Sequence, residues 1–434
     1  MRVFSATESV CPVCLRVIPA ERGVGDDGYI HMRKTCPEHG SFDVLLWEGG
    51  IVDYLKWDTA GEGGNRPPVT VPAAAGCPNS CGLCENHESA GCCALLELTD
   101  RCNLHCPVCF ASAGDGQGRD LTHGEIVRLY DMLLERGGPF NIQLSGGEPT
   151  VRDDLPEIVA LGRERGFTYF QLNTNGLRLA GEEGYAEKLL RGGVSCAFLQ
   201  FDGLDDGVYR ALRGRELLDI KLRAVENCAR AGLPVVLVPT VAPGVNDSML
   251  GDILRFALER LPAVRGVHIQ PISYFGRCSL PEPERRLTIP RVLAEIERQT
   301  GGAMRAEDFA GGGAESAYCS FHASYRRARD GSIKALPRRR GGCCVKSSEA
   351  RDFVAGHWGA REEPDTEPDG FDKFLAEARD NTFTVSGMLF QDAMNLDLER
   401  LRRCYICEAD LERGMVPFCA YNLTDSAGRA LYRR

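Results

Sequence analysis

Three cysteines fall within one short stretch, which reads Thr99-Asp-Arg-Cys102-Asn-Leu-His-Cys106-Pro-Val-Cys109. This C-x3-C-x2-C loop brings three thiolates together on a few residues of backbone. Three thiolates can hold a 4Fe–4S cube and leave one iron without a protein ligand. Because an open metal position is what a catalytic site needs and a structural site avoids, the loop predicts a catalytic cluster.

A glycine-rich run, Gly146-Gly147-Glu148-Pro149, follows the next predicted strand. Glycine lets backbone approach a ligand closely, and the Glu148 carboxylate could pair with an ammonium group. A cysteine loop followed by this run resembles the sequence motifs of the radical S-adenosylmethionine (SAM) superfamily. The resemblance implies that SAM chelates the open iron. It also implies that Gly146 to Pro149, with Ser145 just before them, bind SAM through its amino group.

Polar residues also end the third and fourth predicted strands. Asn173 and Asn175 end the third, and Asp202 ends the fourth. These residues are candidates for contacts with the ribose hydroxyls of SAM or with the substrate. Asn-Gly and Asp-Gly pairs also serve as simple turns, so both interpretations stay open.

The resemblance implies the chemistry as well. An electron from the reduced cluster would cleave SAM into methionine and a 5′-deoxyadenosyl radical, which abstracts hydrogen from an unactivated C–H bond. Cys102, Cys106 and Cys109 would then be the catalytic residues, and the rest of the protein would orient the reactants and exclude quenchers.

From Cys93 onward, short β-rich runs alternate with helical stretches such as His123–Arg136 and Asp154–Gly166, which is typical of βα units and a parallel sheet. Six such units resemble the partial (βα)6 barrel of the radical SAM core. The fold class expected is therefore α/β, in three regions. These are an N-terminal Cys-rich metal-binding region (1–92), the barrel (93–277) and a C-terminal α+β region with further cysteines (278–434). The predicted strands are Ala94–Thr99, Asn141–Ser145, Tyr169–Asn175, Ala197–Asp202, Val235–Val241 and Val267–Ile272.

Polar and apolar residues alternate along these strands. Side chains on a strand point to opposite faces with period two, so residues of one parity share a face. The polar parity predicts an open barrel with a wet, ligand-filled lumen, because a closed barrel packs its interior with branched apolar side chains. Its members are Glu97, Thr99, Asn141, Gln143, Ser145, Gln171, Asn173, Asn175, Gln200, Asp202, His268 and Gln270.

Beyond Cys278 the alternation ends. We expect a helix at Ile289–Thr300, a hairpin at Ser320–Pro337 and a second hairpin at Tyr405–Cys419. A short helix is expected at Asp397–Arg403. The acidic, Gly- and Pro-containing stretch Ser347–Asp369 is expected to be exposed and mobile. The first 90 residues are expected to be loop-rich and held together by metal.

The 434-residue chain carries a net charge of −10, which argues against a nucleic-acid partner. No apolar run approaches the roughly 20 residues of a membrane span, and Met1–Val10 lacks a signal-peptide core. We therefore expect a soluble cytoplasmic protein whose contact with any lipid would be peripheral. Twenty cysteines in such a chain favour metal binding over disulfides.

Three further cysteine groups predict additional metal sites. Cys11, Cys14 and Cys36, with His39 or another cysteine as fourth ligand, suit zinc or a rubredoxin-like iron. Cys77, Cys81 and Cys84 repeat the catalytic spacing and favour a second 4Fe–4S cluster, with His87 or Cys92–Cys93 supplying a fourth ligand; of these, Cys93 is the one we select. Cys404, Cys407 and Cys419 form a third set, which Cys319, Cys343 or Cys344 would complete, Cys343 being preferred. Cys196, Cys228 and Cys278 are expected to be packing residues.

At a finer level, the cysteine motifs and the closing Phe390-Gln-Asp-Ala and Pro417-Phe-Cys-Ala-Tyr-Asn422 runs resemble the archaeal tetraether lipid synthase branch and related radical SAM methyltransferases. Carbon–carbon coupling of lipid alkyl chains is the first expectation. The alternatives are methyl transfer to a lipid or pterin-type substrate, a peptide maturase with auxiliary clusters, and a non-catalytic iron–sulfur carrier. A ferredoxin or flavodoxin would supply electrons. A lipid coupler should show a long apolar tunnel, and a pterin enzyme a compact polar pocket.

Overall fold

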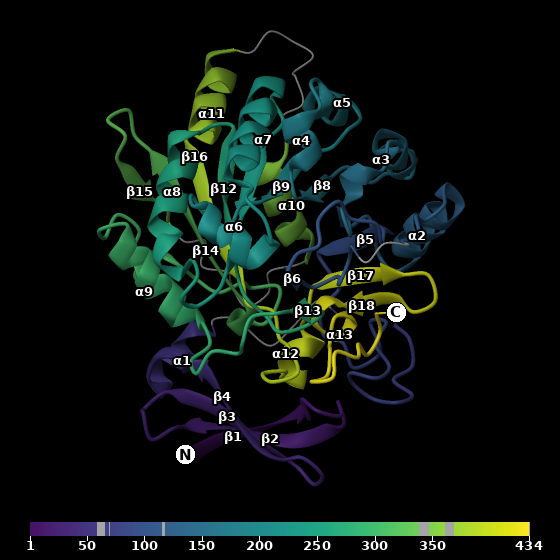
Figure 1. The fold of residues 1–434 in the computed structure, drawn as a ribbon, viewed down its shortest axis with the longest axis vertical. Coiled ribbons are helices and arrows are strands. Elements are labelled where there is room, and N and C mark those ends of the chain that lie inside the picture. The colour runs from purple at the N-terminus through teal and green to yellow at the C-terminus, as the bar shows by residue number, and fades with distance from the viewer. Residues whose placement is uncertain (59–65, 69, 115–117, 338–346, 361–368, 434) are drawn as a thin grey trace.

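The computed structural model describes residues 1–58, 66–68, 70–114, 118–337, 347–360 and 369–433, whose arrangement is shown in Figure 1. The N-terminal part is an antiparallel meander of four strands followed by the helix α1 (Ile51–Trp57). The expectation of a loop-rich region is therefore wrong for residues 1–57, whereas the described residues 70–92 contain neither a helix nor a named strand. On β3 every second side chain is buried, but one of them is Lys34, which conceals the apolar alternation in the sequence. The strands are β1 (Arg2–Val10), β2 (Val17–Val24), β3 (Ile30–Cys36) and β4 (Gly40–Trp47).

Six parallel strands form the centre of a second, larger sheet, as the βα alternation predicted. In spatial order they are β12 (Val264–Pro271), β10 (Val235–Val238), β9 (Cys196–Gln200), β8 (Phe170–Thr174), β7 (Asn141–Gly146) and β5 (Cys93–Thr99). Helices connect them: α2 (His123–Glu135), α3 (Leu155–Arg163), α4 (Leu177–Gly181), α5 (Tyr185–Arg191), α6 (Asp206–Arg213), α7 (Leu218–Ala231) and α8 (Leu250–Glu259).

The helix α2 shows how these units are specified. Thr122 and Glu125 form a capping box that fixes where the helix begins. Ile126, Leu129 and Leu133 are spaced three and four residues apart along α2. All three are fully buried in the main core. This spacing places them on one helix face, which packs against the sheet.

The C-terminal region extends the same sheet at both ends. Beside β12 lie β16 (Thr382–Met388), parallel to it, and then the hairpin of β14 (Ser320–Arg327) and β15 (Ile333–Ala335). Beside β5 lies the hairpin of β17 (Ile406–Asp410) and β18 (Gly414–Pro417), so both predicted hairpins are confirmed. In the described part of the chain the sheet has two edges, β15 and β18, and is open.

Smaller elements complete the fold. The predicted helices at 289–300 and 397–403 are confirmed as α9 and α12. The short strands β6 and β13 pair with each other, and β11 pairs with β12. Their bounds are β6 (Val108–Cys109), β11 (Thr240–Val241), β13 (Arg277–Cys278), α9 (Ile289–Gln299), α11 (Gly370–Asp380), α12 (Leu398–Arg402) and α13 (Phe418–Tyr421).

The stretch expected to be exposed and mobile contains a helix, α10 (Ser347–Trp358), so that expectation is wrong for these residues; 361–368 lie outside the described residues. Trp358 is 8% exposed and packs against Phe198, with ring centroids 5.1 Å apart. Arg351 donates to the Pro139 carbonyl (2.6 Å) and accepts from Asn141 Nδ2 (3.0 Å). The helix therefore lies across the N-terminal ends of the central strands.

The N-terminal sheet, purple in Figure 1, lies against the C-terminal segment around α12. Asp397 accepts from Thr7 Oγ1 (2.9 Å) and from Arg22 Nε (2.9 Å). The buried Lys34 ammonium donates to the Ala393 carbonyl (2.8 Å) and to Ser9 Oγ (3.0 Å). Residues from the two ends of the chain thus form one polar interface.

Candidate active site

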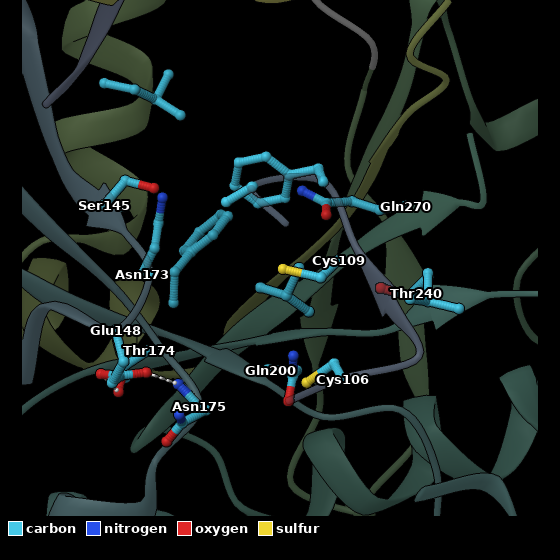
Figure 2. A pocket seen from close by; sticks show the side chains of 18 of the residues that line it. Cys106, Cys109, Ser145, Glu148, Asn173, Thr174, Asn175, Gln200, Thr240 and Gln270 are labelled. Carbon is cyan, nitrogen blue, oxygen red and sulfur yellow. Dashed lines mark hydrogen bonds between the residues drawn. The ribbon is translucent and has the colours of Figure 1, made fainter. Parts of the chain in front are cut away.

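A cavity of about 240 Å³ opens inside the curve of the large sheet, at the C-terminal ends of the central strands. The three cysteines of the predicted cluster loop, Cys102, Cys106 and Cys109, all line it. Ser145, Gly146, Gly147, Glu148, Asn173 and Asn175 also line it. The cysteine loop and the glycine-rich run, which are distant in sequence, therefore meet at one site (Figure 2).

Two arginines hold the cysteine loop in place. Arg213 donates to the Val108 carbonyl (3.1 Å) from the cavity side. Arg277 donates to the Cys106 carbonyl (2.8 Å), and its strand β13 pairs with β6, which contains Cys109. Burial raises the pKa of the Cys102 thiol to about 12, and burial also raises the pKa of Cys106. Such thiols ionise when a cation is bound, which is what a metal cluster provides.

The two glycines of the run allow the backbone to approach a neighbouring loop. A Cβ on Gly146 would lie 2.4 Å from the Thr99 carbonyl oxygen, and one on Gly147 would lie 2.3 Å from the Arg101 carbonyl oxygen. The same contact is held by the Gly147 N–H, which donates to Thr99 (2.7 Å), and by the Glu148 N–H, which donates to Arg101 (2.9 Å). The glycine-rich run is therefore docked directly on the start of the cysteine loop.

Glu148 is buried, and its carboxylate joins the ends of β7 and β8. It accepts from Thr150 Oγ1 (2.5 Å), Thr174 Oγ1 (2.7 Å) and the Asn175 N–H (2.7 Å). Burial raises its pKa. Asn175 in turn donates from Nδ2 to Asn103 Oδ1 (2.7 Å) in the cysteine loop. Both residues thus position the loops as well as lining the cavity.

Asp202 and Pro149 differ from the other predicted SAM-binding residues because neither is among the lining residues. Asp202 is fully buried and accepts two bonds of 2.7 Å from Arg213, which does line the cavity. Lys221 is also fully buried; its ammonium donates to the Asn175 carbonyl (2.5 Å) and to Gln200 Oε1 (3.2 Å), and burial lowers its pKa to about 8. The sequence reasoning missed Arg213 and Lys221, because a cation on a helix usually faces solvent.

Seven of the twelve residues in the polar parity line the cavity, and five do not: Glu97, Thr99, Asn141, Gln171 and Asp202. Gln143, Asn173, Gln200, His268 and Gln270 all line it, and the expectation of a polar lumen is confirmed for these residues. Glu97 and Thr99 lie outside the lining, where they bond to Arg433 and Asp120.

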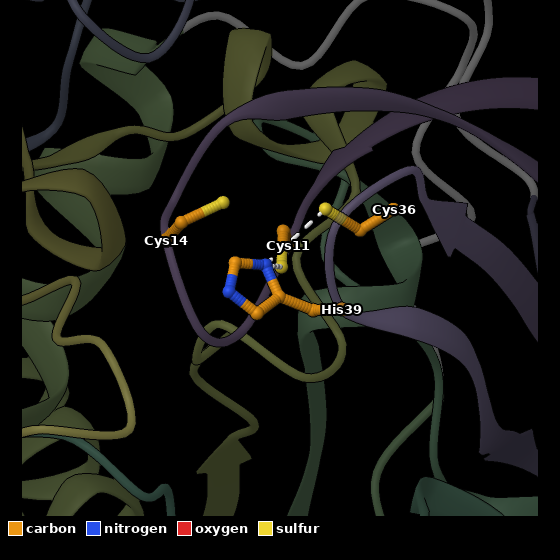
Figure 3. A group of neighbouring side chains, drawn as sticks. All are labelled: Cys11, Cys14, Cys36 and His39. Carbon is orange, nitrogen blue, oxygen red and sulfur yellow. Dashed lines mark hydrogen bonds between the residues drawn. The ribbon is translucent and has the colours of Figure 1, made fainter.

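The N-terminal metal motif forms a compact site on the four-stranded sheet (Figure 3). The ligand atoms of Cys11, Cys14, Cys36 and His39 all lie within 4.8 Å of one another. His39 Nδ1 is 3.5 Å from Cys11 Sγ and 3.4 Å from Cys36 Sγ. Zn–S and Zn–N bonds of about 2.3 and 2.0 Å in a tetrahedron place such atoms roughly 3.5 Å apart. Of the two fourth ligands considered, the structure supplies His39, and a Cys3His set fits zinc.

Cys77, Cys81 and Cys84 lie together beside the C-terminal segment. Cys77 and Cys81 share a hydrogen bond, and Cys84 is near enough to affect the pKa of Cys81. His87 is buried, and its Nε2 bonds to the Cys404 carbonyl (2.8 Å). Cys93 lies on β5 instead, where its thiol accepts from Gln143 Nε2 (3.3 Å).

In the third set, Cys419 lies near Cys404 and near Cys319, which was one of the three candidates to complete it. Burial raises the pKa of Cys419, and the nearby thiols of Cys404 and Cys319 raise it further. Cys319 also accepts from Arg400 Nη2 (3.4 Å). Cys407, on β17, belongs to the main apolar core, although Cys404 is near enough to raise its pKa as well. Cys343 and Cys344 lie outside the described residues.

Comparison with known families agrees with this geometry. The model of the radical SAM superfamily matches residues 96–257. The chain belongs to the radical SAM superfamily of enzymes. A second family model, described as the HMPTM N-terminal zinc ribbon domain, matches residues 3–48, which hold the Cys3His group.

Among relatives, the 7,8-dihydro-6-hydroxymethylpterin dimethyltransferase of Methanocaldococcus jannaschii is 43% identical over 307 residues, 70% of this radical SAM chain and 60% of that protein. The GTP 3′,8-cyclase of Paenarthrobacter nicotinovorans is 31% identical over 211 residues, 48% of this chain and 58% of that protein. The chain therefore spans about 60% of the length of these relatives. The SAM-bound structure of Streptococcus suis SuiB aligns with a TM-score of 0.40 at 16% identity, covering 50% of this chain and 47% of that one.

Radical SAM membership implies a 4Fe–4S cluster and SAM, and the residues present fit both. Cys102, Cys106 and Cys109 are the cysteines among the lining residues described, so one iron of a cube would have no cysteine ligand. Among the described helices, none combines the length and apolar character that crossing a bilayer requires.

Proposed function

We propose that this radical SAM enzyme transfers methyl groups to a pterin-type heterocycle. The observation that carries the proposal is the 43% identity to a dihydropterin dimethyltransferase over 70% of the chain. This relative favours the methyl-transfer alternative over the first expectation, which was coupling of lipid alkyl chains.

The cavity supports the same choice. Its inner end is lined by Phe198 and His268, and the indole of Trp358 on α10 packs behind both rings, with centroids 5.1 and 6.0 Å away. The helix α10 therefore occupies the space into which an alkyl chain would extend if it entered the cavity from the SAM side. A compact pocket closed in this way suits a small planar substrate better than a long chain.

Each group of residues has a role in this proposal. Cys102, Cys106 and Cys109 hold the catalytic cluster, and Ser145 to Glu148 with Asn175 bind SAM. When bound, the cluster and SAM supply a 5′-deoxyadenosyl radical that abstracts hydrogen from a C–H bond. Arg213, held by Asp202, keeps the cysteine loop in place, and the buried wall excludes water from the reaction.

The remaining metal sites are assigned within the same proposal. Cys11, Cys14, Cys36 and His39 hold zinc. Cys77, Cys81 and Cys84 hold one auxiliary cluster, and Cys319, Cys404 and Cys419 hold another. A ferredoxin- or flavodoxin-type protein supplies electrons. The division into a metal-binding region (1–92), a radical SAM core (93–277) and a C-terminal auxiliary region (278–434) remains part of the proposal.

The test is an anaerobic incubation of reconstituted protein with SAM, a reductant and 7,8-dihydro-6-hydroxymethylpterin, followed by mass spectrometry. We expect one or two methyl groups to be added to the pterin. Cys106→Ala should abolish both methylation and deoxyadenosine formation while iron at the other sites is retained. A parallel incubation with archaeal diether lipid checks the coupling alternative. Lipid coupling with no pterin methylation would overturn the proposal.

A further inference from the structure

Charge is divided unevenly along the wall of the cavity. Among the described lining residues, the formally charged side chains are Glu148 and Arg213. Both contact the loops at the cysteine end, where Glu148 joins the ends of β7 and β8 and Arg213 bonds to Val108. A zwitterion such as SAM suits this end of the cavity.

The other polar side chains of the lining are neutral. Five of them project from β7, β8, β9 and β12, and we call them the amide floor: Gln143, Asn173, Gln200, Gln270 and His268. Burial lowers the pKa of His268 to about 4, so its imidazole is neutral at pH 7. Neutral amides offer hydrogen-bond donors and acceptors together, which matches a ligand edge that carries both and has no charge.

Some of these amides are already committed to the protein. Asn173 Nδ2 donates to Gln143 Oε1 (3.2 Å), and Gln171 Nε2 donates to Asn173 Oδ1 (2.8 Å). Gln200 Oε1 accepts from Lys221. These bonds fix the orientation of the floor before any ligand arrives.

Gln270 is different. Within the described part of the chain its side-chain amide has no hydrogen-bond partner, although it lies inside the cavity. The amide hydrogens of Gln200 also have no acceptor among the described residues. Figure 2 shows Asn173, Gln200 and Gln270 around the same space as Cys106 and Cys109. Free donors at fixed positions in a cavity are what ligand recognition needs.

An apolar wall complements the floor. Phe110, Phe275, Phe390 and Phe418 line the cavity and contact one another, with the Phe390 and Phe418 ring centroids 4.4 Å apart. Three of the four come from outside the cysteine loop, from the loop after β12 and from the C-terminal region. A flat aromatic ligand could place its face against these rings and its edge against the amides.

We infer that the amide floor is the subsite for the edge of an uncharged, planar nitrogen heterocycle, and that Gln270 supplies a specificity-determining hydrogen bond to it. The inference rests on the proposed function and names how the substrate of that site is recognised. An alkyl chain in the cavity would cover these half-buried amides without bonding to them, which disfavours a lipid at this position.

Gln270→Met tests this inference, because it removes an amide that holds nothing else in the fold. Binding of 7,8-dihydro-6-hydroxymethylpterin and of SAM would be measured anaerobically by calorimetry on reconstituted protein. We expect the dihydropterin dissociation constant to rise about tenfold, which is the effect of losing one hydrogen bond in a buried site, while SAM affinity and iron content stay the same. Gln299→Met, the same change at the last residue of α9, where the amide bonds to Asp247 and Gly251, should leave both affinities unchanged.

The outcomes separate the two proposals. Equal dihydropterin affinity in the wild type and in Gln270→Met would overturn the subsite alone. A wild-type protein that binds SAM but no dihydropterin would overturn the proposed function, and the subsite with it. Loss of SAM affinity in Gln270→Met would assign the residue to the cofactor and would also overturn the subsite.

Discussion

Several single residues at this site hold the glycine-rich run against the cysteine loop. Gly146 and Gly147 were expected to make room for a ligand, yet the nearest atoms to a Cβ at either position belong to the backbone of residues 98–101. Asn175 and Glu148 act in the same way, since both bond to residues on neighbouring loops. The shape of the SAM-binding run is therefore tied to the shape of the cysteine loop.

Gly147→Ala should damage this contact. The added methyl would lie 2.3 Å from the Arg101 oxygen and 2.9 Å from the Asp100 oxygen, and backbone cannot move away cheaply. We expect the free energy of unfolding to fall by about 1–3 kcal/mol, as for other overpacked sites, and SAM affinity to fall with it. Urea unfolding and anaerobic SAM titration would measure the two effects.

The matched control is Gly124→Ala. Gly124 lies in α2, and a Cβ there would meet nothing within 4 Å. Because alanine favours a helix over glycine, this variant should gain about 0.5–1 kcal/mol and keep its SAM affinity. A Gly147→Ala protein that matched it in both measurements would show that the docking of the two loops is unimportant.

At the scale of elements, two of the cysteine groups sit where separate elements meet. The zinc ligands come from the turn after β1 and from the end of β3 and the turn after it. The Cys319, Cys404 and Cys419 group joins the start of β14, the approach to β17 and the helix α13. Metal at these points would connect strands that are not neighbours in their sheets.

His39→Ala should remove the N-terminal metal. Three thiolates remain, but a tetrahedral zinc would lose its fourth ligand, so its affinity falls. We expect about one zinc per chain to disappear on dialysis, with cluster iron unchanged and a lower melting temperature. Elemental analysis gives the metal content. His31→Ala is the control, since His31 lies on the same sheet and bonds to Asp43 and Asp27, away from the metal group. Equal zinc in both variants would refute the site.

Two variants, Cys404→Ala and Cys407→Ala, test which of these two cysteines holds an auxiliary cluster. Cys404 raises the pKa of both Cys419 and Cys407, but of these three thiols only Cys407 belongs to the main apolar core. We expect the first variant to lose about one cluster of iron and the second to keep it, with Cys407→Ala losing stability through poorer packing. Iron loss in Cys407→Ala alone would reverse the assignment.

At the scale of the whole molecule, the strand pattern predicted the six parallel strands, both C-terminal hairpins and the polar lumen, because a period of two is visible locally. It could not predict that β16 and β17 join the two ends of the central sheet, since strand partners far apart in sequence leave no local signal. Arg213 and Lys221 were missed for a related reason: their burial depends on Asp202 and Asn175, which come from other units. Trp358 was missed because its helix lies in an acidic stretch.

The interface between the two ends of the chain predicts a pH effect. Burial lowers the pKa of Lys34 to about 7, from an ordinary 10.5. Below pH 7 the lysine is charged in both states, and its burial lowers stability. As pH rises from about 7 to 10.5, the folded protein releases this proton first, so the free energy of unfolding should increase by up to ~1.4 kcal/mol per pH unit.

The Lys34→Met variant should lose the part of this rise in the free energy of unfolding that comes from Lys34. Chemical unfolding at pH values from 6 to about 10 would show the wild type gaining stability relative to the variant. Lys56→Met, on the exposed side of α1, serves as control and should follow the wild type. Parallel curves for wild type and Lys34→Met would contradict the prediction.

The pairing of β5 with β17 has a consequence for how the protein is made. β5 carries the residues that lead into the cysteine loop, and it emerges from the ribosome long before its neighbour β17 has been translated. During that interval one edge of the nascent sheet, and the thiols beside it, are exposed to solvent or to a scaffold protein. Iron–sulfur delivery would then have its easiest access while synthesis is still under way, before the last strands close over the loop.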